Sequence, residues 1–200
     1  MNQILFIDIE TARDSSIPDE LYNAAILKNE NQYMFLPAYN KIIALCIGWI
    51  NKEWVFSVKS LEWDEREMLE KFFSFIDRYV IIGYNVLQFD LPFIIHRAMH
   101  YGLRIPDCLR TFWKKPWEIN NVIDLMQVSK SFGLRYYSLN DMCLLLGIAS
   151  PKDGMDGSQI QQAYDDGKLD DIVHYCMADV VATKNLFDKF VTLNLLPPTS

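Results

Sequence analysis

The chain has 200 residues, of which 50% are hydrophobic and 14% aromatic, and its formal net charge is −7. This length and composition are typical of one globular domain spanning residues 1–200, and they exclude a disordered or low-complexity protein. The acidic balance argues against a broad, non-specific nucleic-acid surface, which would be basic. It is compatible with an enzyme that binds a single nucleic-acid strand locally and holds its own metal ions.

The four cysteines are widely separated and form no Cys-x-x-Cys pair; they are Cys46, Cys108, Cys143 and Cys176. No secretory signal precedes Asp8, and no apolar run has transmembrane length. We therefore expect free thiols, a cytoplasmic location and no membrane partner.

Alternating and continuous apolar patterns predict five strands, at residues 3–9, 41–50, 53–58, 80–84 and 121–125. A turn at residues 51–52 joins the second strand to the third, which predicts an antiparallel hairpin there. Helices are predicted at residues 19–28, after an N-cap at Asp64, from Leu91 to Gly102, from the cap at Ser138 to Gly147, at 158–164 and at 170–193. This order of elements predicts a mixed α/β sheet with a parallel portion.

The first motif, in residues 4–11, is an apolar run that ends in two carboxylates, Asp8 and Glu10. Because side chains alternate faces along a strand, these two carboxylates point the same way. They repel each other unless a positive charge lies between them, and hard oxygen ligands suit Mg²⁺ or Mn²⁺. A strand that runs out into a polar loop would also explain this short pattern.

The second motif follows the predicted strand at residues 80–84. It contains Asn85, Phe89 and Asp90, between the end of a strand and the start of a helix. Open α/β sheets bind their ligands at such carboxyl ends of strands. The alternative role for Asp90 is the N-cap of the next helix.

The third motif lies on the last predicted helix, where Tyr175 and Asp179 are four residues apart and share one face. An aspartate in a helix with an apolar stripe is unfavourable unless it is solvated or paired. The alternative is a solvent-facing Asp179 with Tyr175 packed at the edge of the helix.

Taken together and in this order, the motifs resemble those of the DEDDy group of 3′–5′ exonucleases, which have an RNase H-like fold. Within that group the chain resembles the stand-alone predicted exonucleases related to the proofreading domain of family B DNA polymerases. The resemblance implies a five-stranded mixed sheet, with strands one to three antiparallel and strands four and five parallel to strand one, flanked by helices. It is carried by residues 6–11, 83–85, 89–92, 138–141, 155–159 and 175–180.

The resemblance implies a site for two Mg²⁺ or Mn²⁺ ions with four carboxylate ligands. Asp8 would bridge both ions, Glu10 and Asp179 would complete the site of the water-activating ion, and Asp90 would support the second ion through water. Two-metal hydrolysis of a phosphodiester needs carboxylates clustered in this way. Tyr175 would orient the attacking water, because a tyrosine with a reference pKa of about 10 is a poor base at neutral pH.

The same resemblance implies that Asn85, Phe89 and Thr11 contact the substrate, with Phe89 stacking on a base near the 3′ end. His174 competes with Tyr175 for the water-orienting role, because a sister group places a histidine five residues before the last aspartate. His174 stands at that offset from Asp179. We assign the role to Tyr175, because the second motif resembles the tyrosine-bearing group.

Other patterns have weaker functional interpretations. His96 and His100 have the i, i+4 spacing of a zinc-binding pair, but they lack a third ligand nearby, so we predict a surface role. Residues 112–117 interleave basic and aromatic side chains, which suits either a single-strand platform or a surface loop with its tryptophans in the core. Lys152 is either a phosphate contact or a solvated loop residue. Asp124 either points into the cleft or caps a turn, and it is not assigned to the metal set.

The sequence therefore predicts a metal-dependent 3′–5′ exonuclease that removes nucleoside 5′-monophosphates from single-stranded DNA. RNA or short oligonucleotides are alternative substrates, because no contact that reads the sugar is recognisable. A non-catalytic nucleic-acid-binding module on the same fold is the second alternative, and the four retained carboxylates argue against it. The acidic composition is compatible with an unidentified protein partner that delivers the substrate.

Overall fold

The computed structural model describes residues 3–29, 36–51, 55–61, 64–110, 114, 119–130, 137–149 and 155–196. Its strands are β1 (Gln3–Arg13), β2 (Asn40–Ile50), β3 (Phe56–Ser60), β4 (Tyr79–Gly83) and β5 (Val122–Asp124). Its α-helices are α1 (Asp19–Asn29), α2 (Glu65–Phe73), α3 (Asp90–His100), α4 (Leu125–Lys130), α5 (Leu139–Leu145), α6 (Ile160–Asp165) and α7 (Leu169–Thr192). The predictions about Lys152 and, apart from Lys114, about residues 112–117 lie outside the described residues.

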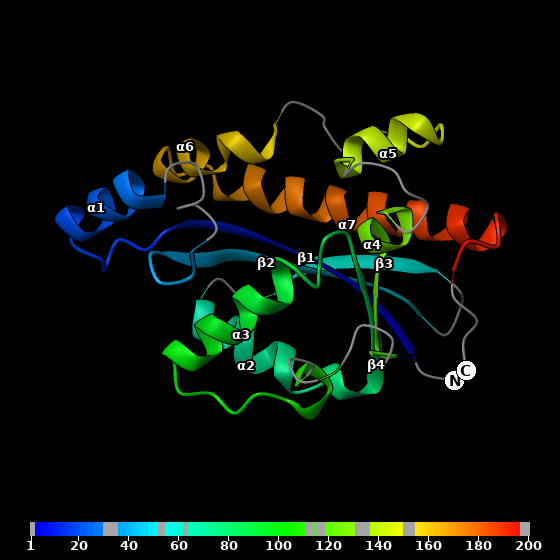
Figure 1. Cartoon of the computed structure of the whole chain (residues 1–200), viewed down its shortest axis with the longest axis horizontal. Helices are drawn as coiled ribbons and strands as arrows, with labels where there is room; N and C mark the ends of the chain where they lie inside the picture. Colours follow the sequence, from blue (N-terminus) through cyan, green and yellow to red (C-terminus); the bar gives the residue numbers. More distant parts are fainter. Residues whose placement is uncertain are drawn as a thin grey trace.

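The five strands form one mixed sheet in the order β3-β2-β1-β4-β5. β2 pairs antiparallel with β1 and β3, whereas β4 pairs parallel with β1 and β5. The predicted mixed sheet flanked by helices is therefore confirmed. Helices α2 and α3 cover one face of the sheet, and α7 crosses the other face with α5 and α6 outside it (Figure 1).

Local signals placed several of these elements correctly. Asp64 is the N-cap of α2 and accepts a hydrogen bond from the backbone N–H of Glu67, and Ser138 forms a capping box with Asp141 at the start of α5. Tertiary pairing explains one difference from the prediction. β1 continues beyond Ile9 to Arg13 because its last residues pair with the start of β2. The short helix α4 directly follows β5 and was not predicted.

Side-chain alternation along β1 divides the core into two layers. Leu5, Ile7 and Ile9 pack in the layer that also contains the buried residues of α2 and α3. Phe6 and Ala12 pack in the layer built on α7. Because alternate residues share a face, Asp8 and Glu10 lie on the α7 side of the sheet.

A β-bulge interrupts the pairing of β1 with β2 directly beyond Glu10. Glu10 pairs with Ala44 and Thr11 pairs with Ile42, so Ile43 is an extra residue on β2. The backbone N–H of Ile42 donates to Oε1 of Glu65 in α2, at 2.7 Å. Bulges bend and twist a strand locally, and this one lies beside the second carboxylate of the first motif.

A buried ion network holds α3 against this bulge. Arg97 of α3 is 2% exposed and donates two hydrogen bonds to Glu65, at 2.8 and 2.7 Å, and one to Asp14, at 2.9 Å. It also donates to the carbonyl of Pro37, and the Tyr101 hydroxyl donates to Glu65. The network therefore joins α2, α3, the residue that follows β1 and the turn that precedes β2.

α7 approaches the sheet closely where it crosses β2. A Cβ atom at Gly48 would lie 2.7 Å from Cγ1 of Val180 and 2.5 Å from the ring of Phe56. Real Cβ contacts are never this short, so a side chain at this position would push α7 or β3 away from β2. Gly48 therefore allows α7 to pack close to the sheet at Val180, the residue that follows Asp179.

No helix in the described part of the chain combines the length and apolarity needed to cross a membrane. All four cysteines are free, as predicted, and three of them are buried.

We predict that Arg97→Ala lowers the free energy of unfolding by about 3–5 kcal/mol, because it leaves two buried carboxylates without their cation. Urea denaturation followed by circular dichroism measures this change. Arg66→Ala is the matched control and should change stability little, because its ion pair with Glu70 is exposed and screened. An Arg97→Ala variant as stable as the wild type would show that the network adds no net stability.

Candidate active site

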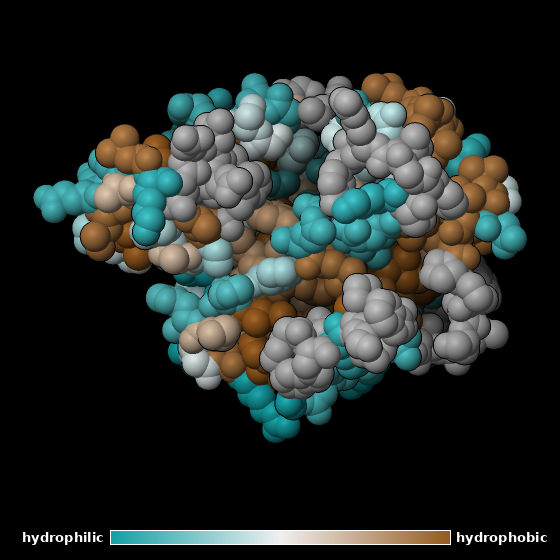
Figure 2. All heavy atoms as spheres, viewed as in Figure 1, coloured by the Kyte–Doolittle hydropathy of each residue, from teal (hydrophilic) through white to brown (hydrophobic). Residues whose placement is uncertain are grey.

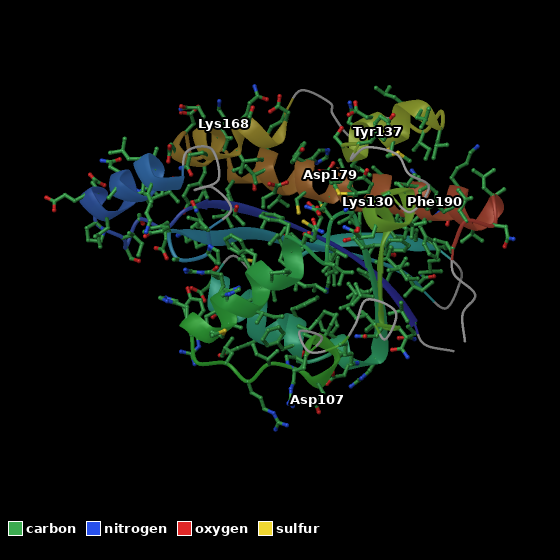
Figure 3. The ribbon with its side chains drawn as sticks, in the orientation of Figure 1. Asp107, Lys130, Tyr137, Lys168, Asp179 and Phe190 are labelled. Atoms are coloured by element: carbon green, nitrogen blue, oxygen red, sulfur yellow. The ribbon has the colours of Figure 1, made fainter. Side chains whose placement is uncertain are left out.

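Three carboxylates from β1 and α7 lie together on the α7 side of the sheet. Asp8, Glu10 and Asp179 each offer a ligand atom, and these atoms lie within 4.8 Å of one another. Asp179 stands at the middle of the long helix α7, above the sheet (Figure 3). All three residues are partly buried. The structure thus brings together the first and third sequence motifs, which are about 170 residues apart along the chain.

The electrostatics of this cluster are unfavourable without a cation. Burial, followed by the carboxylates of Asp90, Glu10 and Asp179, raises the pKa of Asp8 well above its usual range. Burial and the carboxylates of Asp179 and Asp90 do the same to the pKa of Glu10. Oδ2 of Asp8 is also buried without a hydrogen-bond partner. An oxygen-only donor set that holds an unpaired, buried oxygen fits a hard divalent cation.

Asp90 is the first residue of α3 and is only 3% exposed. The residue at the N-cap is Phe89, whereas Oδ1 of Asp90 accepts a hydrogen bond from the backbone N–H of Ile9 in β1, at 3.1 Å. Its alternative role as an N-cap is therefore wrong. Burial raises the pKa of Asp90 to about 7, and the nearby Asp124 and Asp179 carboxylates add to this shift. Asp90 is thus an electrostatic neighbour of the cluster, outside the group of three.

Tyr175 lies one helical turn before Asp179 and donates a hydrogen bond to its carboxylate. Burial, together with the carboxylates of Asp179, Glu10 and Asp8, raises the pKa of Tyr175 well above its usual range. The phenol therefore remains protonated at neutral pH and acts as a hydrogen-bond donor. His174 is exposed on the same helix.

Asp124 at the end of β5 fastens the loop between β4 and α3. Its Oδ1 accepts from the backbone N–H groups of Asn85 and Met126, both at 3.0 Å, and its Oδ2 accepts from that of Leu87, also at 3.0 Å. Of the two roles considered for Asp124, the structure thus assigns it the capping of neighbouring turns. Sequence reasoning missed its link to Asn85, because 39 residues separate the two partners.

The residues expected to contact substrate lie in three positions that the structure describes. Asn85 has a positive φ of 65°, a conformation that asparagine adopts more readily than most residues. Asn85 and Phe89 line a cavity beside α3. Thr11 is partly buried and directly follows the bulge in the pairing of β1 with β2. Hydrophobic residues lie beside hydrophilic ones in the middle of the face seen in Figure 2.

The possible zinc pair has other roles. His96 and His100 are both exposed. Nδ1 of His96 lies 2.6 Å from the carbonyl oxygen of Pro92, and the ring of His100 packs edge-on against the ring of Tyr101. In the described residues, the three-carboxylate cluster is the group that could hold a metal ion.

A family model described as a predicted 3′–5′ exonuclease related to the exonuclease domain of PolB matches residues 32–195. The chain belongs to this exonuclease family. The resemblance inferred from the sequence motifs is therefore confirmed. The match begins after β1, so it covers Asp90, Tyr175 and Asp179 but neither carboxylate of the first motif.

DNA polymerases are among the proteins similar to this chain. The DNA polymerase delta catalytic subunit of Caenorhabditis elegans is 26% identical over 158 residues, and a DNA polymerase of Pyrococcus glycovorans is 29% identical over 141 residues. The matches cover 65% and 63% of this chain but only 14% and 18% of those proteins. The solved family B DNA polymerase of Pyrobaculum calidifontis superposes with a TM-score of 0.68 at 19% identity, over 98% of this chain and 25% of that one, which shows a shared fold.

We predict that Asp124→Ala lowers the free energy of unfolding by about 1–3 kcal/mol, because it leaves partly buried backbone N–H groups without an acceptor. Hydrogen exchange at the amides of Asn85 and Leu87 should accelerate in this variant, and amide-resolved exchange measures that change. Asp124→Asn is the matched comparison, because it keeps one of the two accepting oxygens, and its effect should be intermediate. Unchanged exchange at both amides in Asp124→Ala would contradict the fastening role.

Proposed function

We propose that this exonuclease hydrolyses phosphodiester bonds at the 3′ end of single-stranded DNA and releases nucleoside 5′-monophosphates, with two Mg²⁺ or Mn²⁺ ions as cofactors. One observation carries the proposal: ligand atoms of Asp8, Glu10 and Asp179 converge within 4.8 Å, and Oδ2 of Asp8 is buried without a hydrogen-bond partner. Membership in the exonuclease family supports the direction and class of the reaction.

When bound, the two ions would generate the attacking hydroxide and stabilise the leaving oxygen of an in-line displacement. Asp8, Glu10 and Asp179 would hold the ion that binds the attacking water, with Asp8 shared between both ions. Asp90, whose Oδ1 accepts a hydrogen bond from the backbone N–H of Ile9 in β1, would help to hold the second ion. Because the pKa values of Asp8 and Glu10 are raised, cations compete with protons for these carboxylates.

Tyr175 would orient the attacking water rather than remove its proton. Its raised pKa keeps the hydroxyl protonated, and its hydrogen bond to Asp179 places it against a proposed metal ligand. This geometry supports Tyr175 over the exposed His174. Asn85, Phe89 and Thr11 would contact the terminal nucleotides.

We predict that Mn²⁺ binds the cluster and stabilises the folded protein. At a concentration one hundred times its dissociation constant, a ligand of the native state adds about 2.7 kcal/mol to the free energy of unfolding. Thermal unfolding with and without chelator measures the gain. Asp8→Asn should abolish it, whereas Asp107→Asn, an exposed residue in another part of the chain, should keep it. Equal Mn²⁺ stabilisation of Asp8→Asn and the wild type would contradict the site.

We predict that the protein shortens a 5′-labelled single-stranded DNA from its 3′ end in Mg²⁺ or Mn²⁺. Asp8→Ala and Asp179→Ala should lose this activity, because each removes a proposed metal ligand. Tyr175→Phe should lower turnover and leave binding of the DNA largely intact, since it removes only the hydroxyl that orients water. Gel electrophoresis of the products at fixed times measures the rate.

The control for the tyrosine is His174→Ala, which should behave like the wild type. If His174→Ala loses the activity and Tyr175→Phe retains it, the histidine orients the attacking water instead of the tyrosine. An RNA of the same sequence tests the substrate, and faster cleavage of RNA would make the protein an exoribonuclease. Intact DNA and RNA under every metal condition, with binding still measurable, would indicate a non-catalytic binding module.

A further inference from the structure

One buried carboxylate, that of Glu65 in α2, is bonded to groups of two other elements. Glu65 is 5% exposed. Its Oε1 accepts from the backbone N–H of Ile42 in β2, at 2.7 Å, and from Nε of Arg97 in α3, at 2.8 Å. Its Oε2 accepts from Nη2 of Arg97, at 2.7 Å, and from the hydroxyl of Tyr101, at 2.8 Å. Each oxygen thus has two donors within the protein, and none of these four hydrogen bonds goes to the acidic cluster.

The hydrogen bond from Ile42 lies at the bulge beside Glu10. Ile42 pairs with Thr11 directly after the bulge, whereas Glu10 pairs directly before it. A bulge locally disrupts the ladder of hydrogen bonds and bends the strand that carries it. The carboxylate of Glu65 supplies an acceptor for a backbone donor at this disrupted point. It therefore holds the part of β2 against which the backbone of Glu10 pairs.

The hydrogen bonds from Arg97 hold α3, whose first residue is Asp90. Arg97 also donates to Asp14, at 2.9 Å. At the other end of the helix, Oδ1 of Asp90 accepts from the backbone N–H of Ile9, at 3.1 Å. Ile9 directly precedes Glu10, and Asp14 follows it by four residues. The segment that bears Glu10 therefore lies between two hydrogen-bonded ties to α3.

This support bears on the geometry that a cation requires. Mg²⁺ binds oxygen ligands at about 2.0–2.1 Å and tolerates little distortion. Repulsion among the carboxylates of the cluster favours their separation whenever no cation lies between them. Glu65 belongs to α2, on the face of the sheet opposite to Glu10. Its influence on the cluster is therefore exerted through the backbone and not by contact with a ligand.

We propose that Glu65 is a positioning residue for the metal site and sets the affinity of the acidic cluster for divalent cations by holding Glu10 and Asp90. This inference rests on the proposed function, because it takes the cluster to bind those cations. Removal of the Glu65 side chain leaves the N–H of Ile42 without this acceptor and Arg97 without its bidentate partner. The bulge and α3 then move more freely, and the two ligands occupy the binding geometry for less of the time.

Titration with Mn²⁺ at a temperature well below unfolding, with the free ion quantified by electron paramagnetic resonance, measures the affinity of the folded protein. Glu65→Ala should raise the dissociation constant about tenfold. This is the lower end of the 10–100-fold range for groups that orient metal ligands, since Glu65 acts through the backbone. Glu65→Gln keeps an oxygen for the N–H of Ile42 and should recover most of the affinity. Equal affinity of Glu65→Ala and the wild type would overturn the positioning role.

Ile76→Ala is the control for a loss of stability alone. Ile76 is fully buried in the core layer that contains residues of α2, and its apolar side chain adds nothing to the ion network. Its truncation leaves a cavity and should make the protein easier to unfold, while the affinity for Mn²⁺ stays at the wild-type value. An equal loss of affinity in Ile76→Ala and Glu65→Ala would trace the effect to general stability and overturn the positioning role.

Arg97→Lys tests the same role if Glu65→Ala fails to fold. Lysine keeps the positive charge but lacks the planar fork that binds both oxygens of Glu65. The dissociation constant for Mn²⁺ should therefore rise in this variant, and an unchanged value would overturn the positioning role.

Asp8→Asn and a parallel assay of DNA cleavage separate this role from the proposed function. Binding of Mn²⁺ that is lost in Asp8→Asn but unchanged in Glu65→Ala overturns the positioning role and leaves the metal site standing. Affinity that depends on Glu65, without cleavage of single-stranded DNA, supports the positioning role and overturns the proposed function. Absence of Mn²⁺ binding to the wild type overturns both.

Discussion

Repulsion among carboxylates is the constraint on which this structure depends. Burial raises the pKa of Asp8 most, and three other carboxylates, from β1, α3 and α7, raise it further. Their convergence costs free energy, because buried like charges disfavour ionisation. Two features of the fold hold the elements that carry these carboxylates in place. They are the close contact of α7 with β2 at Gly48 and the ion network that anchors α3.

Carboxylates in the described part of the chain differ in how their charge is satisfied. Glu65 and Asp14 share the guanidinium of Arg97, and Asp124 accepts from backbone N–H groups. These carboxylates have structural partners within the protein. Oδ2 of Asp8, in contrast, is buried without any partner. This unsatisfied oxygen is compatible with the proposed binding of a cation.

Helix α3 joins Asp90 to the ion network and lines a cavity. Its first residue, Asp90, reaches β1, and its eighth residue, Arg97, closes the ion network. One face of the helix between them lines the cavity. A displacement of α3 would therefore move the carboxylate of Asp90 and one wall of the cavity together.

The sequence by itself determined the strands, the capped helices and the identity of the candidate carboxylates, because these follow from local periodicity and from short motifs such as Asp8 with Glu10. It also indicated the family. Only the tertiary structure decided which role each acidic residue takes. Asp90 is no N-cap, Asp124 fastens a loop, and Glu65 accepts the N–H at a bulge, since each depends on a partner distant in sequence. The cavity likewise joins residues 36–37 to α3, and no local pattern encodes such a pairing.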